Sequence, residues 1–121
     1  MATEDDARRI ALSLPATTER PSYGTPGFRV KDKLFARVHD LPDTLVVWVP
    51  DMAEKEALLS SAPDTFFETP HYDGYPMVLV RLGTIEVDEL TEVLTDSWRA
   101  RAPRRLLAEY ERDHAEPQEP T

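Results

Sequence analysis

The side chains best suited to chemistry lie in one short segment, residues 69–76, which reads TPHYDGYP. The segment supplies an imidazole, a carboxylate and two phenols, groups able to act as acid, base and hydrogen-bond donors around a small ligand. These groups belong to His71, Tyr72, Asp73 and Tyr75. Two prolines fix φ and Gly74 permits a positive φ, so the segment is predicted to be a rigid loop. Aromatic residues beside proline and glycine also anchor loops on a core, and both interpretations stay open.

No other group of residues completes a catalytic or metal-binding pattern. The three histidines, His39, His71 and His114, share no ligand spacing, so we expect no metal. The serines lack a Gly-x-Ser-x-Gly context, and the four glycines form no phosphate-binding loop. The chain contains no cysteine, which excludes disulfides and thiolate chemistry. We therefore expect no catalytic residue, no cofactor and no enzyme activity.

Basic residues gather in two places that bear on nucleic-acid binding. The first set lies in a predicted hairpin and the second around a predicted helix boundary: Arg29, Lys31, Lys33 and Arg37, then Arg99, Arg101, Arg104 and Arg105. A two-stranded ribbon with Arg and Lys on its exposed face can lie along DNA phosphates. The formal net charge of -9 opposes the approach of a polyanion, so any binding should be weak and salt-dependent. A solvated strand face is the alternative interpretation.

Hydrophobic spacing predicts the elements that would position these groups. We expect a first helix that begins after a Thr3 cap and ends at Pro15, and a connector at residues 16–26. An antiparallel meander should follow, with strands near residues 28–31, 34–39 and 45–49 and a turn at residues 31–33. Pro50 should end the third strand, and a cap at Asp51 should begin a helix at residues 52–61. Residues 66–67 and 77–82 are predicted to be extended.

The last part of the chain is predicted to be helical. Asp88 is expected to cap a helix with one buried stripe, and Pro103 to begin a final helix. The stripe consists of Leu90, Val93, Leu94, Ser97 and Trp98. Trp98 could stack on a base or ligand, but its spacing with Leu94 favours a core position.

The length of 121 residues fits one domain, predicted at residues 1–114 with a flexible acidic tail at residues 115–121. No apolar run approaches the roughly 20 residues of a membrane span, and the first six residues are acidic where a signal peptide is basic. The sequence therefore predicts a cytoplasmic protein without a membrane partner.

Several blocks of the sequence together resemble one family. The blocks are residues 23–28 (YGTPGF), residues 33–36 (KLFA), residues 69–82, Trp98 and residues 102–106 (APRRL). In order and spacing they resemble the MmcQ/YjbR family of small bacterial proteins. The resemblance implies an α+β fold, sometimes grouped with CyaY-like proteins, in which helices cover an antiparallel sheet. It also implies DNA binding, with the hairpins as wings.

Two functions are therefore predicted. The first is non-specific DNA binding through the two basic sets. The alternative is a non-enzymatic module that binds a protein or a small ligand through the aromatic side chains of Tyr23, His71, Tyr72 and Tyr75.

Overall fold

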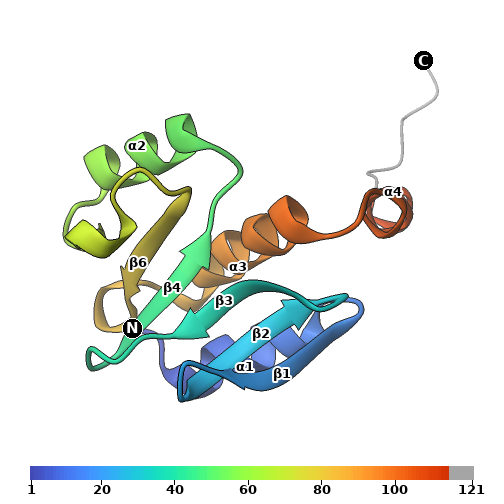
Figure 1. Ribbon diagram of the computed structural model, residues 1–121, viewed down its shortest axis with the longest axis horizontal. Helices are drawn as coiled ribbons and strands as arrows, with labels where there is room; N and C mark the ends of the chain where they lie inside the picture. The colour runs from blue at the N-terminus through green and yellow to red at the C-terminus, as the bar shows by residue number, and fades with distance from the viewer. Residues whose placement is uncertain (115–121) are drawn as a thin grey trace.

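An antiparallel sheet with the strand order β1-β2-β3-β4-β6-β5 forms the frame of the molecule (Figure 1). The computed structural model describes residues 1–114, and the predicted acidic tail at residues 115–121 lies outside them. The strands are β1 (Thr17–Ser22), β2 (Thr25–Val30), β3 (Lys33–Val38), β4 (Thr44–Trp48), β5 (Phe66–Phe67) and β6 (Met77–Arg81). The α-helices are α1 (Glu4–Ser13), α2 (Met52–Ser61), α3 (Val87–Arg101) and α4 (Arg104–Asp113). Short 3-10 turns, η1 (Pro70–Tyr72) and η2 (Leu82–Thr84), flank β6.

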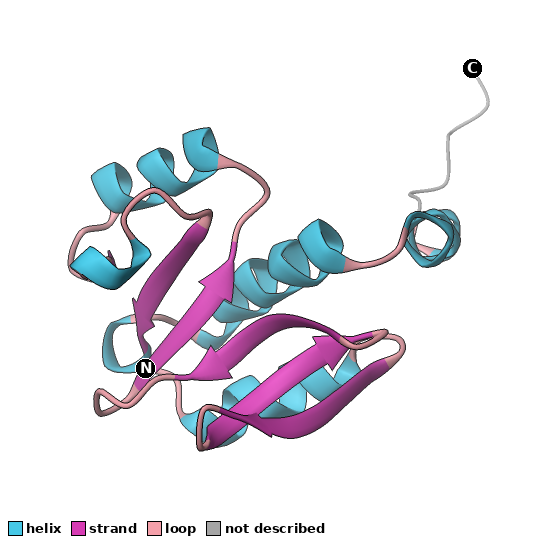
Figure 2. Ribbon diagram, in the orientation of Figure 1, coloured by secondary structure: helices cyan, strands magenta, loops and turns pink. Residues whose placement is uncertain are grey.

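Helices α1 and α3 pack on one face of the sheet, α1 against β1 and β2 and α3 against β3 and β4. In Figure 2, α1 lies behind β1 and β2. Between these two helices and the strands, Phe28, Leu45, Val47, Val78 and Val80 are completely buried. The tryptophan of α3, Trp98, is also completely buried, and its Nε1 donates a hydrogen bond of 2.9 Å to the Pro15 carbonyl. The predicted core position of Trp98 is confirmed.

The opposite face of the sheet, which we call the open face, is defined by the strand register. Arg37 of β3 pairs with Val46 of β4, Val46 pairs with Leu79 of β6, and Leu79 pairs with Phe67 of β5. Paired residues point to the same side of a sheet, so these four side chains form one row across it. The loop of residues 69–76 lies over this row, because Tyr72 packs against Val46 and Leu79.

Helix ends agree with the predicted caps in two cases and differ in one. The Thr3 hydroxyl and the Asp6 carboxylate form a capping box, and Asp51 accepts a hydrogen bond of 2.8 Å from the Glu54 amide. The predicted Asp88 cap is wrong, since α3 begins at Val87 with Glu86 in the cap position, and Asp88 lies in the first turn. There its carboxylate still interacts favourably with the helix dipole. No helix among residues 1–114 is long and apolar enough to cross a membrane.

The predicted connector at residues 16–26 is wrong, because these residues form β1 and begin β2. Strand β1 lies at the sheet edge, and four of its six residues are exposed, so it lacks the apolar alternation that marks a strand in sequence. The hairpin turns at Tyr23 and Gly24, which both have a positive φ, as a tight hairpin requires. The predicted turn at Lys31 and Asp32 has the same backbone signature and is confirmed.

Candidate functional site

A buried lysine anchors the loop of residues 69–76, which we call the aromatic loop. The ammonium of Lys55 on α2 donates hydrogen bonds of 2.7 Å to the Tyr72 carbonyl and 2.8 Å to the Tyr75 carbonyl. It also lies 2.7 Å from the Glu68 carboxylate, and the side chain of Lys55 is only 1% exposed. A buried ammonium needs such partners, so Lys55 fixes the loop backbone at two points. No sequence pattern indicated this role of Lys55.

Tyr72 joins the loop to the middle of the open face. Its side chain is 3% exposed, and its hydroxyl accepts a hydrogen bond of 3.0 Å from Nη2 of Arg37. The rings of His71 and His39 approach its ring edge-on, with centroid distances of 4.9 Å and 6.1 Å. Tyr72 is therefore in contact with groups from β3, from β4 and β6, and from its own loop.

Arg37 is held in one orientation by neutral groups. Its Nη1 donates to the Thr25 hydroxyl at 3.2 Å and to the Val38 carbonyl at 3.1 Å. The exposed ring of Tyr23 lies 5.4 Å from the guanidinium carbon, in cation–π range. Among residues 1–114, no carboxylate forms an ion pair with Arg37. Arg37 is therefore a fixed, half-buried positive charge beside the aromatic loop.

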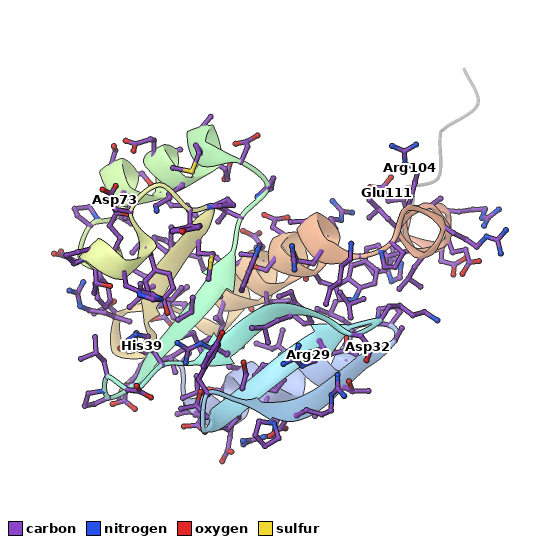
Figure 3. The ribbon with its side chains drawn as sticks, viewed as in Figure 1. Arg29, Asp32, His39, Asp73, Arg104 and Glu111 are labelled. Atoms are coloured by element: carbon purple, nitrogen blue, oxygen red, sulfur yellow. The ribbon has the colours of Figure 1, made fainter. Side chains whose placement is uncertain are left out.

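The imidazole of His39 lies close enough to this charge for its pKa to be affected. Burial lowers the pKa of His39 below its ordinary 6.5, and the positive charge of Arg37 and the proximity of His71 lower it further, while Asp40 opposes the shift. Its Nδ1 accepts a hydrogen bond of 3.1 Å from the Leu41 amide, which requires an unprotonated nitrogen. Figure 3 shows His39 beyond the end of β3, on the loop toward β4.

A hollow of about 260 Å³ opens beside Tyr72, and its walls are His71, Tyr72, Tyr75 and Met77. Three of the four residues predicted for a ligand site thus line one hollow. The fourth, Tyr23, is not a wall of this hollow; it lies in the β1–β2 turn, where its ring contacts the guanidinium of Arg37. Met77 was missed because it reads as an ordinary strand residue, and the alternation of β6 could have placed it on the face of Leu79.

The eight predicted basic residues occupy several surroundings instead of one surface. Arg37 is bonded within the open face, and Arg101 donates to the Leu34 carbonyl at 3.0 Å while its guanidinium lies 4.8 Å from the Trp48 ring centroid. Arg99 lies 5.5 Å from the Tyr110 ring centroid on α4. The Nε of Arg29 is buried without a hydrogen-bond partner among the described residues. Arg104 extends from the same side of α4 as Glu111 (Figure 3).

One pair of residues does bring the two basic sets together. Lys31 from the β2–β3 turn and Arg105 from α4 line a second hollow, of about 220 Å³, together with Pro103, Leu106 and Glu109. Lys33 begins β3 at the other side of the same turn and is exposed. The first turn of α4 carries no acidic residue and no side-chain cap. We call this region the hairpin–α4 end.

Comparison with known proteins identifies the family. A family model described as YjbR matches residues 12–100. The Mycobacterium bovis sequence named uncharacterized protein Mb2600 is 39% identical over 127 aligned residues, which cover 91% of this chain and 96% of the relative. This chain belongs to the YjbR family. Uncharacterized protein Rv2570 of Mycobacterium tuberculosis strain H37Rv matches this YjbR-family chain with the same identity and coverage.

A crystal structure supports the fold of this YjbR-family protein. Deinococcus radiodurans protein DR2400, described by the family-model domain DUF419, superposes with a TM-score of 0.72 over 97% of this chain and 91% of its own. At 22% sequence identity, this likeness concerns the fold. The predicted family and the predicted α+β class, with helices packed on an antiparallel sheet, are confirmed.

The YjbR match also separates the two candidate regions. It includes Arg37, Lys55 and the whole aromatic loop, whereas it ends before Arg101 and before α4. The open-face site is thus built entirely from residues of the matched range. The hairpin–α4 end combines a turn inside the range with a helix outside it.

Proposed function

We propose that this YjbR-family protein is a non-enzymatic binding module that takes a small ligand with one apolar ring on its open face. The observation that carries the proposal is the hollow of about 260 Å³ whose wall is the lysine-anchored aromatic loop. Ligand sites are concave, mostly apolar and largely preformed, with a few placed polar groups. This hollow combines aromatic and thioether walls with the fixed phenol of Tyr72.

The size and chemistry of the walls favour a single ring. Pockets for drug-sized molecules hold about 300–1,000 Å³, and this hollow lies just below that range. Tyr75 is 58% exposed, so its ring is not part of the core and is free to cover a bound ligand. His71 turns its ring toward the ring of Tyr72, a packing contact that orients the imidazole without making it a general base.

The proposal is tested with benzyl alcohol as a neutral single-ring probe, by saturation-transfer NMR. We expect binding to the intact protein, and weaker binding to Tyr75→Ala and His71→Ala. Both variants should unfold in urea within about 1 kcal/mol of the parent, because these side chains lie at the surface of the hollow. Leu12→Ala is the control for exposed apolar side chains in general and should leave binding unchanged, because Leu12 is 42% exposed and lies on α1, on the other face of the sheet. Equal binding by all variants contradicts the proposal.

The hairpin–α4 end favours a second candidate, weak DNA binding through phosphates. The specific observation is that Lys31 and Arg105, one from each basic set, line the same hollow. Unsatisfied amides at a helix N-terminus and adjacent cations both favour phosphate oxygens. Arg37 and Arg101 take no part in this candidate, because internal contacts hold them.

Fluorescence anisotropy with a random duplex at low salt tests the second candidate. Affinity should fall with salt with a log–log slope of about -0.9 per phosphate contact. Lys31→Glu should reduce binding strongly, whereas Arg9→Glu on α1, which changes the net charge equally, should reduce it much less. Equal losses in the two variants would indicate attraction to total charge alone and would remove the hairpin–α4 end from the interface.

A further inference from the structure

We propose that Arg37 binds a carboxylate, and that the ligand of the open face is therefore a small aromatic carboxylate. This inference rests on the proposed ligand-binding function and names the chemical class of the ligand. It concerns a charged group that is bonded to Tyr72, one wall of the hollow, and that no carboxylate among residues 1–114 neutralises.

The charge of Arg37 is the first argument. The chain has 23 acidic and 14 basic residues, and Arg8, Arg9 and Arg20 all contact carboxylates. Arg37 instead donates to a hydroxyl, a carbonyl and a phenol, all of them neutral. A half-buried charge is normally paired, because removing it from water costs free energy. An anionic ligand would supply the missing partner.

The geometry is the second argument. Three hydrogen bonds fix the guanidinium plane, and Nε has no partner among the described residues and is not buried. Nε–H and the second Nη2–H are therefore free to donate to a carboxylate, the anion that the guanidinium fork matches best. Because the group is already oriented, binding costs little side-chain entropy.

The ligand site has a charged half, the guanidinium of Arg37, and an apolar half, the hollow. The Tyr72 hydroxyl is bonded to Arg37, while the Tyr72 side chain is one wall of the hollow, so one residue connects the two halves. The Tyr23 ring lies in cation–π range of the same guanidinium. The rings of His39 and His71 both lie near the ring of Tyr72, and burial and the positive charge of Arg37 lower the pKa of His39. A bound carboxylate would offset that charge and raise the pKa of His39.

Benzoate and benzamide, which share a shape and differ in charge, provide the test. Amide NMR titrations should give a benzoate Kd of about 1 mM, with saturable shifts near Arg37 and in the aromatic loop. Benzamide should bind about tenfold more weakly, since a charge-assisted hydrogen bond contributes more than a neutral one. Arg37→Gln should remove the difference between the two ligands. Arg29→Gln, which removes an arginine from the neighbouring strand, should preserve it.

The parent protein provides a readout that does not depend on a variant's folding. Saturation with benzoate should raise the His39 pKa, measured from its ring-proton shifts, and benzamide should leave it unchanged. Equal affinity for benzoate and benzamide overturns the inference but leaves the ligand-binding function standing. Inorganic phosphate binding at the same amides as tightly as benzoate also overturns the carboxylate assignment. Binding of neither ring compound contradicts the proposed function as well.

Discussion

At the scale of single residues, the open face depends on buried polar groups whose partners are distant in sequence. Lys55 bonds backbone carbonyls 17 and 20 residues away, and Arg37 bonds a phenol 35 residues away. Each bond fixes one part of the candidate site, either the loop backbone or the guanidinium. The site is therefore preorganised by contacts that contribute to folding stability.

Replacing Lys55 should cost stability because its acceptors would remain buried without a donor. We expect Lys55→Met to lower the free energy of unfolding by about 2–4 kcal/mol, the range for breaking a buried, hydrogen-bonded charge. Lys33→Met, at an exposed lysine, should change it by less than about 0.5 kcal/mol. Urea unfolding measures both changes, and similar small values for the two variants would show that the lysine does not anchor the loop.

His39 should make stability depend on pH in a defined direction. Its pKa in the folded protein lies below the ordinary 6.5, so on acidification the unfolded chain takes up this proton first. Stability should therefore fall as the pH drops below about 6.5, and level off beneath the folded pKa. His39→Gln should lose less stability than the parent between about pH 7.5 and about pH 5.5. An identical pH dependence in urea midpoints would contradict the assignment.

At the scale of elements, the aromatic loop depends on one backbone conformation. Gly74 has a φ of +83°, and a Cβ added there would meet no atom within 4 Å, so only backbone strain opposes a side chain. Gly74→Val should cost about 1–3 kcal/mol, whereas Gly74→Asn should cost less, because Asn tolerates this region. Thermal unfolding compares them, and equal losses would mean that the strain lies elsewhere.

Trp98 ties α3 to the rest of the core. Trp98→Ala should lower stability by about 3–5 kcal/mol through lost burial and a cavity. Trp98→Phe should cost less, because it keeps most of the ring volume and loses mainly the hydrogen bond to the Pro15 carbonyl. Urea unfolding is the measurement. A loss under about 1 kcal/mol for Trp98→Ala would show that the side chain is not needed in the core.

The elements that were predicted from sequence carry a local signal. In α3 the signal is a periodic apolar stripe, in β4 a continuous apolar run, and in α2 the cap at Asp51. The residues of the aromatic loop are contiguous in the chain. The exposed edge strand β1 shows no such pattern. The anchoring role of Lys55 could not be predicted either, because a lysine on a short helix is ordinarily solvated. Only tertiary packing brings its three acceptors around it.

At the scale of the whole molecule, the charge distribution separates the two candidate functions. The chain carries a net charge of -9, yet Arg37 on the open face has no carboxylate partner among residues 1–114, and Lys31 and Arg105 line one hollow of the hairpin–α4 end together with Glu109. The first arrangement is enclosed by aromatic rings and suits a small ligand. The second is solvent-facing and suits phosphates along a strand.

The most direct test of the open-face site is an amide chemical-shift map of the parent protein titrated with benzyl alcohol. If the open face is the binding surface, saturable shifts should concentrate at residues 37–39 and 70–77, with little change at residues 31–33 and 104–109. Shifts concentrated in α4 and the β2–β3 turn, or the absence of any saturable shift, would contradict the account.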